Sequence, residues 1–178
     1  MQKKFHIPCK GIQFIGKIGM YKKFSYFIAT MFGVGYCPFA SGTAGSLATL
    51  PFAFVAAYYG GVVGIVAAAV IVFFAGTAAT KEVLKYTKHD PSIVVIDETA
   101  GQLLTFTAVA DQLVGALDWR AFLLYLFGFG LFRVFDITKP QPARWADSKV
   151  MNAWGVMLDD VFAGIYAAII LYVIAIYL

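Results

Sequence analysis

Residues 24–80 read FSYFIATMFGVGYCPFASGTAGSLATLPFAFVAAYYGGVVGIVAAAVIVFFAGTAAT, and this stretch decides the fold class. None of its 57 residues is Asp, Glu, Lys or Arg. About 20 apolar residues are enough to cross a bilayer once, so the run is too long for one buried helix of a soluble protein. Because it is apolar all round, without the alternation of a membrane β-barrel, we predict an all-α, polytopic helical membrane protein.

The rest of the chain agrees with this class. Only 13% of the 178 residues are charged, against roughly 25% in soluble domains. This length predicts one domain, 1–178, and no nucleic-acid partner is expected. We expect about five spans, which begin near residues 43, 62, 94, 121 and 156. Residues 24–40 would form a re-entrant or broken helix before them, and the alternative is that this segment crosses fully.

Charge placement predicts the orientation. The region 1–23 has six lysines and no acidic residue, so we expect a cytoplasmic N-terminus and a basic arm on anionic headgroups. In the same threading the basic loops 81–92 and 139–154 are cytoplasmic. Among the basic residues, only Arg120 lies in the outer connections. All polar clusters then lie at the cytoplasmic ends of the spans, where we place the active site.

Five carboxylates flank the apolar segments in three clusters, and they are Asp97, Glu98, Asp136, Asp159 and Asp160. At the bilayer centre each would cost about 2.5–3.5 kcal/mol, so together they need an interface, a positive partner or both. Proteins bind Mg²⁺ through carboxylates from several elements, commonly together with the phosphate of the substrate. Such an ion polarises a phosphoryl oxygen and generates hydroxide.

Basic and small residues accompany these acids. Arg133, Asp136 and Lys139 follow one another at intervals of three and share a helix face, so the two cations are suited to a phosphate. Thr43 and Ser46 begin a predicted helix, where an anion is favoured. Taken singly, each group also fits an ion pair, a favourable helix-dipole contact or close helix packing. Their convergence at one membrane face favours a phosphate site.

The common phosphatase nucleophiles are missing. Cys37 is followed six residues later by Thr43, so the Cys-x5-Arg pattern fails, and Asp136-Ile137-Thr138 lacks the first Asp of Asp-x-Asp-x-Thr. The two histidines, His6 and His89, lie outside the clusters. Water activated by a metal ion and a carboxylate nucleophile remain as alternatives.

Four stretches carry a family resemblance, in order from about residue 30 to the C-terminus. They are Gly42–Ser46, Ser92–Glu98, Phe132–Pro140 with Pro142, Arg144 and Trp145, and Gly155–Gly164. Through them the chain resembles the phosphatidylglycerophosphatase A family of bacterial membrane enzymes, which convert phosphatidylglycerophosphate to phosphatidylglycerol in phospholipid biosynthesis. It departs from the family pattern at Ser41, which often is Pro, and at 152–154, where Gly-Gly often precedes Gly155.

The resemblance implies a Mg²⁺-dependent lipid phosphatase of the bacterial inner membrane. It implies functional roles for the five carboxylates, with Asp97, Glu98, Asp136 and Asp160 catalytic and all five, Asp159 included, as metal ligands. The phosphate partners would be Arg133, Lys139 and Arg144, joined by Thr43 and Ser46. The alternative is a small ion- or proton-coupled transporter, which predicts acids at several depths; the mid-span segments 66–74, 123–130 and 167–173 contain none.

Overall fold

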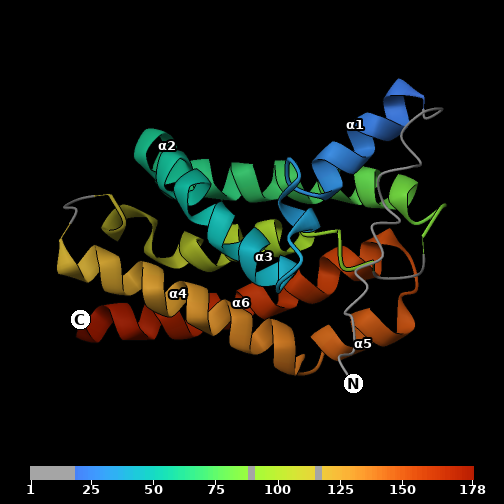
Figure 1. The fold of residues 1–178 in the computed structure, drawn as a ribbon. Coiled ribbons are helices and arrows are strands. Elements are labelled where there is room, and N and C mark those ends of the chain that lie inside the picture. Colours follow the sequence, from blue (N-terminus) through green and yellow to red (C-terminus); the bar gives the residue numbers. More distant parts are fainter. Residues whose placement is uncertain (1–18, 88–90, 115–117) are drawn as a thin grey trace, which may run out of the picture.

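The computed structural model describes residues 19–87, 91–114 and 118–178, and every regular element among them is helical (Figure 1). The α-helices are α1 (Met20–Ala29), α2 (Ser41–Val83), α3 (Ile96–Phe106), α4 (Trp119–Thr138), α5 (Ala143–Lys149) and α6 (Ala153–Tyr177). Two 3₁₀ helices, η2 (Val34–Tyr36) and η3 (Thr107–Gln112), connect them. The all-α prediction is confirmed. Most of the predicted basic arm, residues 1–18, lies outside the described part of the chain.

Three described helices are long and apolar enough to cross a membrane, namely α2, α4 and α6. As a straight rod the 43 residues of α2 would measure about 65 Å, twice a hydrocarbon core of about 30 Å. Gly61 breaks the rod with φ 54° and ψ −142°, and the chain bends back there (Figure 1). A conformation of this kind is open to glycine because it lacks a Cβ atom. The boundary between the spans predicted to begin near residues 43 and 62 is therefore a kink between two helical arms.

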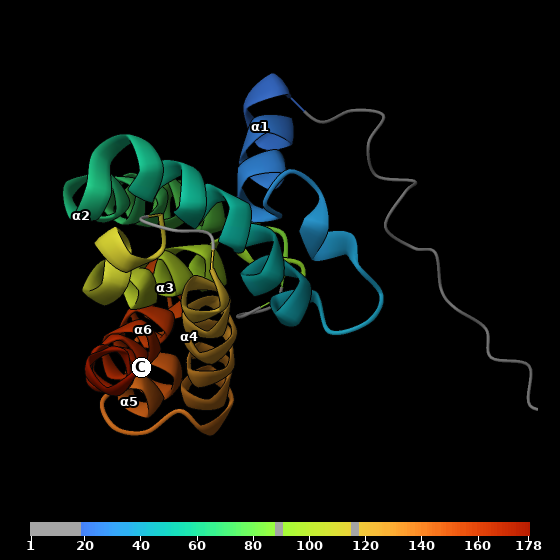
Figure 2. The same cartoon turned by 90° about the vertical axis from the view of Figure 1, so that its left-hand side faces the viewer.

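The short helix α3 lies between α2 and α6 (Figure 2). Nine of its eleven residues are buried, and at about 16 Å it is too short to cross the hydrocarbon core by itself. The structure thus has three helices of spanning length, against about five predicted spans. The difference arises because α2 joins two predicted spans and α3 continues as the 3₁₀ helix η3.

Residues 24–40 form a broken helix. Helix α1 ends at Ala29, and Met31, Phe32 and Gly33 follow with positive φ. Ala40, also at positive φ, precedes the first residue of α2. This sharp return brings the start of α2 beside the start of α3, where the Ser41 hydroxyl donates to the carbonyl of Ser92 at 2.6 Å.

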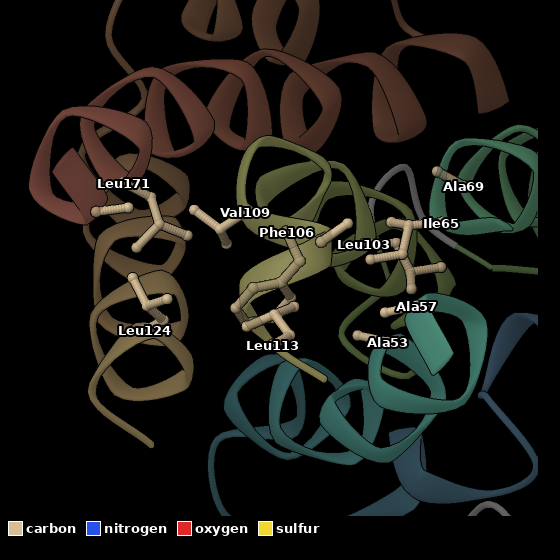
Figure 3. Packing of buried hydrophobic residues seen from close by; sticks show 12 residues of the cluster. Ala53, Ala57, Ile65, Ala69, Leu103, Phe106, Val109, Leu113, Leu124 and Leu171 are labelled. Atoms are coloured by element: carbon tan, nitrogen blue, oxygen red, sulfur yellow. The ribbon is translucent and has the colours of Figure 1, made fainter. Parts of the chain in front are cut away.

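The largest core joins the arms of α2 to α3, η3, α4 and α6 (Figure 3). Its largest fully buried side chains include Ile65, Leu103, Phe106, Leu124 and Leu171. Helix α4 runs antiparallel to α6, because Arg120 at its start donates to the carbonyl of Ala175 at 2.8 Å while Lys139 at its end contacts Asp159. The charged C-terminal end of α4 therefore meets the N-terminal end of α6.

Candidate functional site

A single cleft of about 340 Å³ gathers the charged clusters that the sequence separates. Its polar and charged lining comprises Ser41, Ser92, Asp97, Glu98, Arg133, Asp136, Lys139, Asp159 and Asp160. These residues come from the starts of α2, α3 and α6, the end of α4 and the connecting loops. All five predicted carboxylates and two of the predicted cations thus line one surface.

The crossing of α3 and α6 brings Asp97 to Asp160. Each aspartate precedes a glycine by four residues, Gly101 in α3 and Gly164 in α6. A Cβ atom at Gly101 would lie 2.5 Å from the carbonyl oxygen of Asp160, and one at Gly164 would lie 2.4 Å from the oxygen of Gly101. The two backbones therefore touch, Asp160 through its own carbonyl group, and Asp97 lies one helical turn before Gly101.

Asp97, Glu98 and Asp160 form a compact acidic cluster. Each offers a carboxylate oxygen, and these oxygens lie within 4.8 Å of one another. Asp97 is 6% exposed and Asp160 4%, so water screens their charges poorly. Asp97 Oδ1 accepts one backbone hydrogen bond, from the N–H of Glu98 at 3.0 Å. Three carboxylates this close and this buried stay ionised only beside a positive partner, and without one they take up protons.

Arg133 supplies one positive charge beside the acidic cluster. Its Nη1 lies 2.5 Å from Asp136 Oδ2 and 4.0 Å from Glu98 Oε1. It also donates to the Ser46 hydroxyl oxygen at 3.5 Å, while that hydroxyl donates to the carbonyl of Gly42 at 2.9 Å. Gly42 makes this approach possible, because a Cβ there would lie 2.2 Å from Glu98 Oε1.

Lys139 is the second cation of the cleft and bridges two helices. It ends α4 in the left-handed conformation, with φ 43°. Its Nζ lies 2.6 Å from Asp147 in α5 and 2.6 Å from Asp159 in α6. Burial would lower the pKa of Lys139, but the hydrogen bonds to these two carboxylates outweigh it and raise the pKa above its ordinary value. Lys139 is therefore held in its charged form.

Asp159 plays a different part from the three clustered acids. Its Oδ2 accepts from Lys139 and its Oδ1 accepts from the N–H of Asp160 at 3.0 Å, so both oxygens have partners in the chain. Sequence reasoning missed Asp147, the other partner of Lys139. Asp147 stood in a segment interpreted as a polar loop, and only the formation of α5 turns its carboxylate toward Lys139.

Three predicted phosphate partners do not line the cleft. Ser46 is buried and contacts Arg133. Thr43 is half-buried in the first turn of α2, and Arg144 is exposed on α5. The structure therefore places Arg133 and Lys139 in the cleft and leaves Thr43 and Arg144 outside its lining.

Comparison with known proteins identifies a family of lipid phosphatases, which agrees with a cleft lined by carboxylates and cations. The family model of phosphatidylglycerophosphatase A matches residues 27–175. The phosphatidylglycerophosphatase A of Escherichia coli K12 is 34% identical over 154 residues, which cover 84% of this chain and 82% of the relative. That of Haemophilus influenzae is 33% identical over 150 residues, covering 84% and 87%.

A third relative carries a different description. A protein of Bacteroides thetaiotaomicron, provisionally named a phosphatidylinositol-3-phosphatase, is 37% identical over 149 residues, which cover 81% of this chain and 89% of the relative. No solved structure matches the chain significantly. The family match spans the cleft and nearly all described helices. The chain therefore belongs to the phosphatidylglycerophosphatase A family of lipid phosphomonoesterases.

Proposed function

We propose that the cleft is the active site of this phosphatidylglycerophosphatase and that its activity depends on Mg²⁺ at the cytoplasmic face of a bacterial inner membrane. The observation that carries the proposal is the meeting of five carboxylates with Arg133 and Lys139 in one cleft. A phosphate monoester at the end of a lipid headgroup fits both kinds of group. The cations bind its oxygens, and the carboxylates hold a metal ion that faces it.

The acidic cluster fits a hard divalent cation. Its donors are all carboxylate oxygens, the ligand type that Mg²⁺ prefers, from Asp97, Glu98 and Asp160. The three oxygens lie within 4.8 Å of one another, so one ion can contact all of them, because ligands at about 2.0–2.6 Å from an ion lie at most about 4–5 Å apart. When bound, Mg²⁺ would neutralise charge, polarise a phosphoryl oxygen and lower the pKa of a water molecule.

Charge balance also supports a metal requirement. The five carboxylates of the cleft outnumber its two cations, Arg133 and Lys139, so its formal charge is −3. A phosphate monoester carries nearly two negative charges at neutral pH, and such a surface would repel it. A divalent cation at the acidic cluster removes most of this repulsion.

In this proposal Arg133 and Lys139 bind the phosphate, and Asp136 transfers the proton. Arg133 turns from Asp136 toward the phosphate and binds its non-ester oxygens, and Lys139 binds from the C-terminal end of the same helix. Asp136, which neither contacts Lys139 nor belongs to the acidic cluster, accepts the proton of the attacking water. The phosphorus–oxygen bond to glycerol breaks, the glycerol oxygen takes the proton back from Asp136, and phosphatidylglycerol and phosphate leave.

The remaining predicted residues have supporting roles. Asp159 holds Lys139 and lies beside the metal ligand Asp160, so it influences both groups. Ser46 holds Arg133. Thr43 would favour the phosphate from the start of α2 through the helix dipole, and Arg144 would reach a headgroup from the exposed face of α5.

We place the cleft at headgroup depth in the cytoplasmic leaflet. Lys139, Arg144 and Lys149 lie in the segment beside the cleft, whereas Arg120 marks the opposite end of α4. This asymmetry follows the positive-inside rule. Both arms of α2, together with α4 and α6, would cross the bilayer, and α3 would stay inside the bundle. A lipid could then present its headgroup while its acyl chains remain among the helices.

Phosphate release from defined lipids tests the proposal. The purified chain in detergent is given phosphatidylglycerophosphate, phosphatidylinositol 3-phosphate and phosphatidic acid, each with Mg²⁺ or with EDTA. We expect release from phosphatidylglycerophosphate in Mg²⁺ and none in EDTA. The name of the Bacteroides relative makes phosphatidylinositol 3-phosphate the competing substrate. Equal turnover in EDTA contradicts the metal assignment, and faster release from the inositol lipid contradicts the substrate.

A further inference from the structure

Gln102 has a fully buried side-chain amide that takes part in neither the ion pairs nor the acidic cluster of the cleft. It lies in α3, and its side chain is 0% exposed. Neither Nε2 nor Oε1 has a hydrogen-bond partner. A buried amide without partners is costly, and a leucine of similar size would avoid that cost. A glutamine at this position therefore calls for a functional explanation.

The atoms that would complement this amide belong to two residues of the cleft. Seven buried side-chain polar atoms lack a partner in the described residues, and four of them belong to Glu98, Gln102 and Arg133. The four comprise two acceptors, Glu98 Oε2 and Gln102 Oε1, and two donors, Gln102 Nε2 and Arg133 Nε. By type they would make two donor–acceptor pairs, Gln102 Nε2 with Glu98 Oε2 and Arg133 Nε with Gln102 Oε1.

The position of Gln102 on α3 directs its side chain toward Glu98 and Arg133. Gln102 follows Glu98 by four residues, so the two side chains lie on the same face of α3, about 5–6 Å apart at Cβ. Side chains of a helix lean toward its N-terminus, which for Gln102 is the direction of Glu98 and the cleft. The guanidinium of Arg133 lies 4.0 Å from the Glu98 carboxylate.

We propose that Gln102 is a positioning residue that holds Glu98 and Arg133 in their working orientations. Its amide NH₂ donates to Glu98 Oε2, and its amide oxygen accepts from the N–H at Arg133 Nε, directly or through one water molecule. A carboxylate oxygen accepts at two lone pairs, so Glu98 can serve Gln102 and a cation together. The inference rests on the proposed function, because it assigns Glu98 to the metal and Arg133 to the phosphate.

The test replaces Gln102 by Leu in the full chain, purified in detergent. We expect kcat/KM on phosphatidylglycerophosphate to fall about tenfold or more, the factor that one hydrogen bond to a charged group contributes. We also expect the Mg²⁺ concentration for half-maximal activity to rise. The melting temperature should stay the same or increase, because a costly buried amide is removed.

Tyr125→Phe provides a matched control. Tyr125 also has a buried hydroxyl without a partner, but it packs on Phe106 about 12 Å along α4 from Arg133. Its removal should leave kcat/KM and the Mg²⁺ dependence unchanged. If Gln102→Leu behaves like Tyr125→Phe, Gln102 is a packing residue and the inference is overturned.

Two further variants separate positioning from a general loss of structure. Gln102→Met keeps the length of the side chain and takes the place of the Leu variant if that variant does not fold. In an Arg133→Met background, loss of the Gln102 amide should cost less than in the wild type, because one of its partners is gone. An equal cost in both backgrounds contradicts the contact with Arg133.

The same experiments keep this inference apart from the proposed function. Wild-type activity that is the same in EDTA overturns the metal assignment, whatever the Gln102 variants do. Wild-type activity that requires Mg²⁺, with unchanged kinetics in Gln102→Leu and Gln102→Met, overturns the role of Gln102 alone.

Discussion

Gly42→Ala separates the geometry of the site from the stability of the fold. Gly42 is in the first turn of α2 and has an ordinary helical conformation, so alanine fits its backbone. Alanine is favoured over glycine in a helix by about 1 kcal/mol. The new Cβ would nevertheless lie 2.2 Å from Glu98 Oε1 and 3.1 Å from Arg133 Nη1. The fold should tolerate it, since both atoms end flexible side chains.

The size of the effect follows from these distances. A carbon and an oxygen in contact are about 3.3 Å apart or more, so Glu98 Oε1 must withdraw by about 1 Å. A misplacement of about 1 Å in a catalytic group can cost about 100-fold in rate. We therefore expect kcat to fall about 100-fold while the melting temperature stays within a few degrees of the wild type.

Gly130→Ala is the matched control, and phosphate release from phosphatidylglycerophosphate is the assay. Gly130 is in α4, one turn before Arg133, and a Cβ there would meet nothing within 4 Å. This variant should keep full activity. Wild-type kcat in Gly42→Ala, or an equal loss in both variants, would refute the assignment of Glu98 and Arg133 to the reaction.

Three other predictions address the remaining parts of the site. Asp160→Asn should lower kcat by at least about 100-fold, while the protein still inserts normally into the membrane. It should also abolish any rise in melting temperature that Mg²⁺ induces. Near-normal turnover would exclude Asp160 as a metal ligand. Gly101→Ala should destabilise the protein by about 1–3 kcal/mol and lower activity, because its Cβ would lie 2.5 Å from the Asp160 carbonyl oxygen; unchanged stability in denaturant titrations would contradict the close helix crossing. Lys139→Met should raise KM and lower the melting temperature by the same amount from about pH 7.5 to about pH 9, where both the ammonium group and its carboxylate partners are charged. The raised pKa keeps Lys139 charged below the ordinary lysine pKa of about 10.4, and its contribution would be lost only above that value; a destabilisation that disappears by pH 9 would be inconsistent with this.

The helical class and the charged residues that line the cleft were predictable because they depend on local properties. Hydropathy adds up along a segment, so the uncharged run 24–80 predicted helices of membrane-spanning length before any packing was known, and α2 is such a helix. Alternating helix directions likewise predicted that Asp97, Arg133 and Asp160 lie at one end of the bundle, and the cleft contains all three. The end of α4 at Thr138, before Lys139-Pro140, also followed from local preference.

The roles within the site depend on contacts between distant residues. In the sequence Asp97-Glu98 and Asp159-Asp160 are equivalent pairs, yet Asp159 binds Lys139 while the other three form the acidic cluster. The asymmetry comes from α5, a helix that was not predicted, because its Asp147 and the left-handed turn at Lys139 set the position of the ammonium group.

By itself, the sequence determined that this is a helical protein with apolar segments long enough to cross a membrane, and with five acids and several cations at the helix ends. Only the tertiary structure decided which acids meet, because that depends on where helices cross. The backbone contact of Gly101 with Gly164 sets the distance between α3 and α6, and so brings Asp97 to Asp160. The spacing of residues along the chain specifies the helix face and the helix end on which each residue lies. Which residue of a neighbouring helix it contacts is determined by how the two helices pack.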